Sequence, residues 1–473
     1  MRRLAVLPCL LLIAAAPPPR SGQPLTPDQK LDVIIGKVSA KVLRGHVEGL
    51  VSFGTRHTLS STTDKKRGIG AAMDWAYDRV RSLTRANCNQ CLVFQSPYAE
   101  TTGPRIPRLT RVKNVVFIQN GTQGIKDVVI IQAHIDSRVT DVMNFTSDAP
   151  GANDNASGSA AVIEAARILT QYRFPHTIVY ALLSGEEQGL VGGKVLADFA
   201  KEQGWNVIAV LNNDIIGNSC GSDGVCDADH VRVLSEGPRV QGQSSLAASM
   251  HSYGGENDSP SRNLSRYLDS LAGRVNAGLD VRPIWRTDRF GRGGDHIPFL
   301  DAGFPAARIS VAVENYDYQH QDLRTENGIQ YGDTVDKMDF EYLAKVTKLN
   351  VAALASLASA PLPPEPVVDG AVKPDTTISW PPVRGAASYM VRWRRTDASN
   401  WEHERKFVPQ PSPNPTASAS EPRQLTFQVV LPHIRVDDWI FGVSSVSADG
   451  FESPVASAVP GGAFKPYVAP PKP

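Results

Sequence analysis

Four continuous apolar runs constrain the fold of the first part of the chain more than any other feature. Runs of this length, bounded by polar or turn residues, are typical of strands that are buried on both faces of a sheet. Helical patterns fit between them, including 157–169 and 189–200. This alternation predicts an α/β fold with a mixed, largely parallel sheet and helices on both faces. The four runs are 128–133, 177–183, 206–211 and 306–313.

Two further elements are expected in this part of the chain. The stretch 69–83 has the apolar spacing of an amphipathic helix. The stretch 111–118 alternates in polarity and is followed by Asn120 and Gly121, a typical sequence of a tight turn. We therefore expect 111–118 and the strand that begins at Asp127 to be adjacent and antiparallel.

The composition of the chain changes near residue 360. A proline-dense connector at 361–370 is typical of a linker between domains. The region before it, 23–360, is expected to form the α/β domain. The region after it, 371–460, has short β-branched and aromatic segments separated by turn residues, as in an all-β sandwich. The last residues, 461–473, are proline-rich and are expected to form a flexible tail.

The N-terminus has the features of a secretory signal peptide. Arg2 and Arg3 precede an apolar run at 4–16, and a proline-containing polar stretch follows it. The run is too short to span a bilayer comfortably, and no other stretch is long or apolar enough. We expect residues 1–22 to be removed and the protein to be periplasmic or extracellular, with an N-terminal anchor as the alternative.

Four cysteines remain once the signal is removed. An even number in an exported chain favours two disulfides, most simply Cys88–Cys91 and Cys220–Cys226. The alternative is a structural zinc site with four thiolates, because Cys88 and Cys91 have the spacing of zinc ligands. The wider spacing of the second pair favours disulfides.

Polar residues that directly follow the apolar runs are the strongest functional signal. The carboxyl ends of parallel strands meet at one edge of a sheet, where ligands bind. A further carboxylate, Asp154, lies in the loop that opens the next helix. Imidazole and carboxylate groups without thiolates suit zinc, and less often cobalt or manganese, in a hydrolytic site. The residues that follow the runs are His134, Asp136, Glu186, Glu187 and Asp214.

Each of these residues has a simpler interpretation when it is taken alone. A single histidine at a strand end is more often a hydrogen-bonded structural residue than a metal ligand. Asp154 could cap a helix, and Glu186 with Glu187 could be an exposed acidic pair. Because all of them are expected at one sheet edge, we favour a metal site.

Five motifs follow one another in a fixed order: His-x-Asp, Gly-x-Asn-Asp-Asn-Ala-Ser-Gly, Gly-Glu-Glu, Asn-Asp and a late histidine. Over about 31–358 this order resembles the co-catalytic zinc aminopeptidases of the bacterial leucine aminopeptidase type, whose relatives include glutamate carboxypeptidases and glutaminyl cyclases. The resemblance implies a sheet of the zinc-exopeptidase type and two zinc ions per chain. By resemblance, the ligands are His134 and Asp214 for one ion, Glu187 and His320 for the other, and Asp154 as the bridge.

The resemblance also implies two roles next to the ligands. Glu186 would be the general base, which takes a proton from a water shared by the two ions and returns it to the leaving amine. Asp136 would accept a hydrogen bond from His134 and so orient its ring. Loss of Glu186 should therefore lower the rate with metal largely kept, whereas loss of Glu187 should lower the metal content.

His320 is the ligand that depends most on the resemblance. The family usually has a tyrosine directly before the late histidine, whereas Gln319 stands there in this chain. The nearby Asp-His-x-Pro-Phe element at 295–299 matches a family segment that shapes the substrate pocket. A tyrosine near His320 could stabilise an oxyanion, with a packed structural role as the alternative. The candidates for the substrate pocket are therefore Asp295, His296, Tyr316 and Tyr318.

The second region resembles a fibronectin type III domain, which is an immunoglobulin-like sandwich. The resemblance rests on Ile378-Ser379-Trp380, on the alternating segment 389–394 and on the late segment 441–450. It brings no catalytic residues. The domain could contact a polymer or a surface, or could only pack on the first domain.

Together these features imply an exported metallo-exopeptidase that acts on peptides as an aminopeptidase. One alternative is a single-zinc glutaminyl cyclase, because 295–300 is similar to those enzymes, although 151–155 and 184–189 fit two-zinc peptidases better. The other alternative is a non-catalytic binding protein of the same fold, but such proteins lose metal ligands. The formal net charge of +1 gives no reason to expect nucleic acid or an anionic membrane as a partner.

Overall fold

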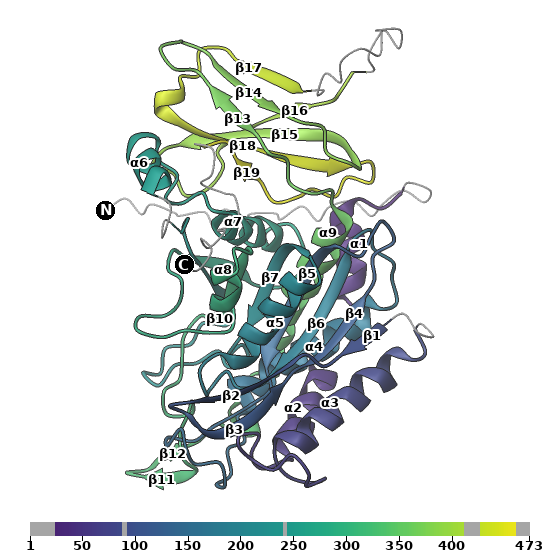
Figure 1. Ribbon diagram of the computed structural model, residues 1–473, viewed down its shortest axis with the longest axis vertical. Coiled ribbons are helices and arrows are strands. Elements are labelled where there is room, and N and C mark those ends of the chain that lie inside the picture. Colours follow the sequence, from purple (N-terminus) through teal and green to yellow (C-terminus); the bar gives the residue numbers. More distant parts are fainter. Residues whose placement is uncertain (1–23, 88–91, 240–243, 411–425, 460–473) are drawn as a thin grey trace, which may run out of the picture.

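The computed structural model describes residues 24–87, 92–239, 244–410 and 426–459. Figure 1 shows an α/β body below a smaller domain of strands. The expected signal peptide, the expected tail at 461–473, and Cys88 with Cys91 lie outside the described residues. Within those residues, no helix has both the length and the hydropathy needed to cross a membrane.

The α/β body contains an eight-stranded sheet in the order β1-β4-β6-β5-β7-β10-β8-β9. The four central strands, β6, β5, β7 and β10, are parallel to one another. Strands β1 and β4 pair antiparallel with their neighbours, and β8 is antiparallel to β10 but parallel to β9. The predicted mixed, largely parallel sheet is therefore confirmed. The strands are β1 (Leu92–Gln95), β4 (Val115–Gln119), β5 (Asp127–His134), β6 (Thr177–Leu183), β7 (Asn206–Asn213), β8 (His230–Ser235), β9 (Asp280–Ile284) and β10 (Ala306–Val311).

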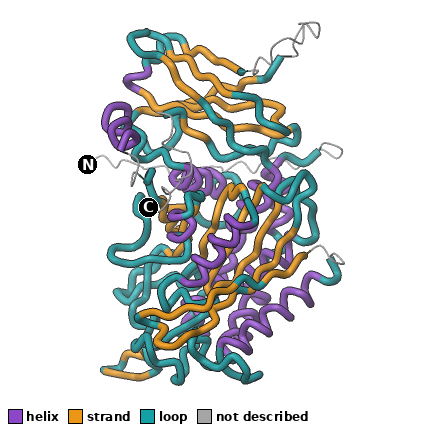
Figure 2. The backbone as a smooth tube through the Cα atoms, in the orientation of Figure 1, coloured by secondary structure: helices purple, strands orange, loops and turns teal. Residues whose placement is uncertain are grey.

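Helices cover both faces of this sheet (Figure 2). Alternate residues of a strand point to opposite faces, so Val129 and Ile131 of β5 join one core and Val128 and Ile130 join the other. The first core includes residues of α1–α4, α7 and α9, and the second includes residues of α5 and α8. The helices are α1 (Pro27–Ile35), α2 (Ala40–Val51), α3 (Ile69–Thr84), α4 (Gly158–Leu169), α5 (Val191–Glu202), α6 (Ser244–Tyr253), α7 (Pro260–Ala272), α8 (Ile297–Asp301) and α9 (Phe340–Ser359).

The prediction of a hairpin around Asn120 and Gly121 is wrong. Strand β4 pairs with β6 and not with β5, and β6 lies between them in the sheet. Because β5 is buried on both faces, it takes a parallel neighbour on each side, and this outweighs the local turn signal. The expected strand at 111–118 is also divided, since Asn114 separates β4 from the preceding β3 (Ile106–Lys113).

Two small hairpins lie at the same end of the body (Figure 1). One pairs β2 (Tyr98–Gly103) with β3, and the other pairs β11 (Arg324–Glu326) with β12 (Ile329–Tyr331). The turn of the first hairpin carries Arg105, which reaches the cavity described below. These hairpins therefore stand beside the carboxyl ends of the central strands.

Within the described residues, the second domain consists of strands joined by turns and one short 3-10 helix (Val436–Asp438), as expected for an all-β region. Two antiparallel sheets, β13-β14-β17 and β16-β15-β18-β19, enclose a core that contains Trp380, Tyr389 and Phe441. Its strands are β13 (Val367–Asp369), β14 (Thr376–Trp380), β15 (Ala386–Arg395), β16 (His403–Phe407), β17 (Phe427–Leu431), β18 (Trp439–Ser447) and β19 (Ala456–Ser457).

The two domains are packed together through buried groups. Arg394 of β15 donates to both carboxylate oxygens of Asp258, at 2.7 and 2.8 Å. Both side chains are almost fully buried, so each needs the other to offset the loss of water. Phe451 of the second domain also belongs to the main core of the α/β body. This contact makes the second domain part of one packed structure.

Candidate metal centre

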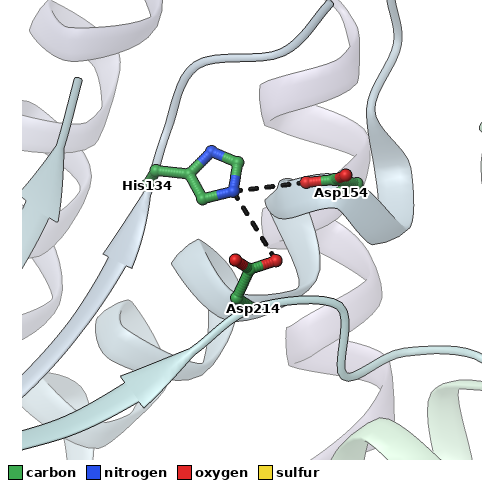
Figure 3. A group of neighbouring side chains, drawn as sticks. All are labelled: His134, Asp154 and Asp214. Atoms are coloured by element: carbon green, nitrogen blue, oxygen red, sulfur yellow. Dashed lines mark ion pairs between the residues drawn. The ribbon is translucent and has the colours of Figure 1, made fainter. Parts of the chain in front are cut away.

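The central strands bring the predicted ligands to one edge of the sheet. His134 is the last residue of β5, and Asp214 directly follows β7. Asp154 lies in the turn Ala152–Ser157, which leads into α4. Figure 3 shows these three side chains converging from separate elements.

The first group of ligand atoms is formed by these three residues. The Nε2 atom of His134 lies 3.2 Å from Oδ1 of Asp154 and 3.7 Å from Oδ1 of Asp214 (Figure 3). All three side chains are at most 5% exposed. Buried carboxylates and an imidazole at this spacing could hold a cation.

A second group shares Asp154 with the first. The Nε2 atom of His320 lies 2.8 Å from Oδ2 of Asp154 and 2.8 Å from Oε1 of Glu187. The two oxygens of one carboxylate therefore face two different imidazole groups. Each group could hold one ion, and Asp154 would then bridge the pair.

The distances between donor atoms allow a test of whether zinc fits. Donors about 2.0–2.2 Å from a tetrahedral zinc ion are roughly 3.3–3.6 Å apart. The separations in the first group, 3.2 and 3.7 Å, are close to this range. The 2.8 Å separations in the second group are shorter, so zinc there requires the donors to move apart by about half an ångström. The donor chemistry of both groups fits zinc.

Two arginines that the sequence did not indicate as functional contact the candidate ligands. Arg308 is fully buried in β10, and its Nη1 atom lies 2.8 Å from Oδ2 of Asp214. The Nε atom of Arg138 lies 2.7 Å from Oε2 of Glu187, and its Nη2 atom lies 2.6 Å from Nδ1 of His320. A charged residue inside the apolar run 306–313 was a usable signal for Arg308. No such signal marked Arg138, which lies in a polar loop.

The charges of the candidate ligands depend strongly on one another. Although burial opposes it, the carboxylates of Glu187 and Asp154 raise the pKa of His320 to about 10. Burial also opposes the charged form of His134, yet nearby carboxylates, with that of Glu186 foremost, raise its pKa well above the usual value. Since a metal needs the unprotonated nitrogen, protons and metal compete for both rings.

Glu186 is in the same cavity but belongs to neither ligand group. Burial, together with the charges of Glu187 and Asp214, raises its pKa well above the usual value, against the opposing effect of His134. Glu186 lies on the cavity wall beside the two groups. A residue that accepts a proton from a bound water must lie in such a position.

Asp136 supports the site in a way that differs from the expected contact. The Nδ1 atom of His134 is 3.1 Å from the main-chain carbonyl of Asp136, and 3.6 Å from its carboxylate. That carboxylate instead accepts the backbone N–H groups of Glu186 and Glu187, at 3.4 and 3.1 Å, and the hydroxyl of Thr58. Asp136 therefore links the strand of one ligand group to the turn of the other.

Other contacts hold the shared ligand in place. Gln319 donates to Oδ2 of Asp154 at 3.1 Å. The carboxylate of Asp333 accepts the backbone N–H groups of Asn153 and Asp154, and burial raises its pKa to about 7. No sequence motif pointed to Asp333, because it lies far along the chain from the residues that it contacts.

A cavity of about 400 Å³ opens onto both ligand groups. Its wall carries the predicted ligands and Glu186, together with glycines and a set of arginines. Its lining residues are Arg105, His134, Arg138, Asp154, Glu186, Glu187, Gly189, Leu190, Asp214, Arg289, Gly291, Arg292, Gly293, Gln319 and His320.

The four residues expected in the substrate pocket do not line this cavity. Asp295 is buried, where it accepts the backbone N–H of Gly193, and burial raises its pKa to about 7. His296 is also buried and contacts the carbonyl of Thr287. Tyr316 is mostly exposed, and the ring of Tyr318 faces the Lys337 ammonium. In the element at 295–299, the side chains of Asp295, His296 and Phe299 are thus buried in the body.

One of the two expected disulfides lies within the described residues. Cys220 and Cys226 are bonded at 2.04 Å, and they close a short loop after Asp214. Asn315 donates to the carbonyl of Cys220, so the loop is attached to the segment that leads to His320.

The fold and the site define a zinc metallopeptidase, and known proteins agree. The model of peptidase family M28 matches residues 114–346, which include every candidate ligand. A probable zinc metalloprotease of Leptosphaeria maculans is 42% identical over 92% of this chain and 98% of its own length. Another, of Pyrenophora teres, is 40% identical over 94% of this chain and 91% of its own length. The chain belongs to peptidase family M28.

A solved structure supports the fold. LapA of Legionella pneumophila, described as an aminopeptidase, superposes with a TM-score of 0.51 at 19% identity, over 73% of this chain and 77% of LapA. At this identity the likeness concerns the fold alone. The expected family and the expected α/β architecture are both confirmed.

Proposed function

We propose that the protein is an aminopeptidase that holds two zinc ions and hydrolyses N-terminal peptide bonds. The observation that carries this proposal is the shared carboxylate: Asp154 presents one oxygen to His134 and the other to His320. Two ligand groups joined in this way are suited to a pair of ions that act on one substrate. The aminopeptidase named among similar folds and the family's zinc chemistry support the assignment.

The residues of the chain supply the remaining parts of the mechanism. Bound zinc would provide Lewis-acid activation of water and of the peptide carbonyl. Glu186 accepts the proton of the attacking water, and its raised pKa keeps it able to deliver that proton to the leaving amine. Asp136 fixes the turn that carries Glu186, through the backbone N–H groups of Glu186 and Glu187.

We also propose that the protein is exported after removal of residues 1–22. The basic and apolar N-terminus and the Cys220–Cys226 disulfide support this proposal. We propose that the all-β domain, from β13 to β19, is a fibronectin type III-like module. Its first strand, β13 (Val367–Asp369), lies inside the expected linker 361–370, so the module begins before the expected boundary at 371. Secretion with mass determination of the new N-terminus tests the cleavage.

A direct experiment distinguishes this function from its alternatives. The purified full chain is analysed for zinc per chain and assayed with amino-acid anilides beside a peptide that begins with glutamine. Two zinc ions and anilide cleavage that Glu186→Gln abolishes would support the proposal. One zinc ion with cyclisation of the glutamine peptide only would replace it with a glutaminyl cyclase. Neither activity in the zinc-loaded protein would indicate a binding protein.

A further inference from the structure

We propose that Arg105 and Arg292 bind a carboxylate of the substrate, so that the enzyme prefers peptides that carry a carboxylate next to the scissile bond. This inference rests on the proposed peptidase function and names its substrate class. Its starting point is the unusual charge of the cavity wall, which contains four guanidinium groups. These belong to Arg105, Arg138, Arg289 and Arg292.

The loaded cavity carries an excess of positive charge. Its four arginines face four acidic side chains, those of Asp154, Glu186, Glu187 and Asp214. Asp288 and Glu314, behind the wall, offset part of the charge of Arg289 and Arg292. Two bound zinc ions would add four positive charges and leave the site positive. A cavity of this sign concentrates and orients anionic ligands.

Two of the four arginines are already engaged within the protein. Arg138 contacts Glu187 and His320, so its guanidinium is used at the metal centre. Arg289 is largely buried and is held by both Asp288 and Glu314. Neither group has the freedom to make a new ion pair without losing an internal one.

Arg292 is less completely neutralised. Its Nη1 atom lies 2.8 Å from Oε2 of Glu314, but that carboxylate also contacts Arg289 and Arg232. One negative charge is therefore divided among three guanidinium groups. The Arg292 side chain is 31% exposed at the cavity, and its remaining N–H groups can meet an incoming carboxylate.

Arg105 reaches the cavity from the opposite element, the turn between β2 and β3. Its Nη1 atom donates to the main-chain carbonyl of Glu187 at 2.9 Å, which anchors the side chain beside a candidate ligand. No carboxylate of the described residues forms an ion pair with Arg105. Its charge is therefore available at the edge of the metal centre, where a carboxylate near the scissile bond would lie.

Two parts of a peptide could supply that carboxylate. One is the acidic side chain of a residue next to the scissile bond, and the other is the free carboxyl terminus of a dipeptide. Both would form charge-assisted hydrogen bonds with a guanidinium. The experiment therefore includes one matched pair of substrates for each source.

The test compares kcat/KM within each pair of substrates for the full zinc-loaded enzyme. Glutamyl and glutaminyl anilides differ only in side-chain charge, and Leu-Ala and Leu-Ala-amide differ only at the carboxyl terminus. The variants are Arg105→Gln and Arg292→Gln. The matched control is Arg286→Gln, which removes an exposed charge from the same segment as Arg292 but outside the cavity lining. Using ratios cancels any general loss of activity.

The expected result is that the wild-type enzyme prefers the charged member of at least one pair. Each cavity variant should lower that ratio about tenfold, as loss of a charge-assisted hydrogen bond does, while Arg286→Gln leaves it unchanged. The pair that responds identifies the source of the carboxylate. Cleavage of all four substrates without discrimination, or equal ratios in all variants, would overturn the inference and leave the peptidase intact. Zinc-loaded protein that cleaves none of them would instead refute the proposed function, and this inference with it.

Discussion

The two ligand groups of the candidate metal centre share Asp154 but are supported very differently. In the first group, His134 and Asp214 stand at the ends of central strands, with side chains at most 4% exposed. In the second group, His320 lies in a loop, has a φ of +56° and is 23% exposed. One half of the centre is thus built on the sheet and the other half on a turn and a loop. The first half should therefore be the more rigid.

The arginines that neutralise the carboxylates of the two groups differ in the same way. Asp214 is paired with Arg308, a fully buried residue of the sheet. Glu187 is paired with Arg138, which is partly exposed in a loop. Removal of a ligand should consequently disturb the fold in the first half and mainly the metal in the second.

The largest effect is expected from Asp154→Asn. The substitution removes a negative charge that serves both groups, so we expect both zinc ions to be lost and activity to fall below detection. Zinc analysis by mass spectrometry, together with anilide cleavage, measures this. A variant that keeps one firmly bound ion would show that the two groups are independent.

The second largest effect is expected from Glu186→Gln. This substitution tests the proton acceptor, which serves both halves of the centre. The rate should fall by roughly 10²–10⁴-fold while zinc content stays at the wild-type level, because Glu186 moves a proton and is not in either ligand group. Glu187→Gln is the matched control in the adjacent position, and it should lower the zinc content. Loss of metal from Glu186→Gln would contradict this division of roles.

A comparison of Asp214→Asn with His320→Asn tests the difference between the halves. Asp214→Asn leaves the buried Arg308 without its closest partner, so the metal-free protein should lose about 3–5 kcal/mol of unfolding free energy. His320→Asn also removes an ion-pair partner of Asp154 and Glu187, but these keep His134 and Arg138 as partners and His320 is partly exposed, so the loss should be smaller than that of Asp214→Asn. Urea unfolding in the presence of a chelator provides both values. Equal destabilisation by the two substitutions would remove the proposed difference.

A smaller effect is expected from Asp136→Asn. This carboxylate connects the strand of His134 to the turn of Glu187 through backbone N–H groups. Weakening such a support typically lowers metal affinity by about 10–100-fold. Competition with a chelator of known affinity measures the change, and an unaltered zinc affinity would show that Asp136 is not needed to position the ligands.

The smallest effect is expected from a change of one pH unit. The pKa of His320 is raised to about 10, and that of His134 is also raised, so both rings bind protons near neutral pH in the metal-free protein. Each ion must displace one proton, and its apparent affinity should therefore fall about tenfold for each unit by which the pH is lowered. Zinc competition at pH 6, 7 and 8 measures this slope, which should be the same for both halves. Affinity that does not depend on pH would contradict the role of the histidines.

The sequence predicted the half of the site that depends on strands. His134 and Asp214 follow apolar runs, and strand periodicity together with the parallel sheet places their side chains at one edge. The loop contacts could not be predicted in the same way, because they join residues far apart in the chain: Arg138 contacts His320, and Asp333 contacts Asp154. The conformation of a loop depends on tertiary packing, for which local sequence gives no periodic signal.

The prediction of the fold from the sequence was limited in a similar way. The segments around β5, β6 and β7 were correctly expected to be buried strands, but the pairing of β4 with β6 was not expected. The local preference for a turn at Asn120 and Gly121 was weaker than the burial of β5 on both faces. The packing of Phe451 into the first domain was likewise outside what composition can reveal.

The zinc content of the wild-type chain and of His320→Asn tests the shared-carboxylate centre most directly. Both proteins are loaded with zinc, passed through a desalting column and analysed for zinc per chain. We predict two ions in the wild-type protein and one in the variant, because the buried group of His134, Asp154 and Asp214 remains. One ion in both proteins would contradict the account.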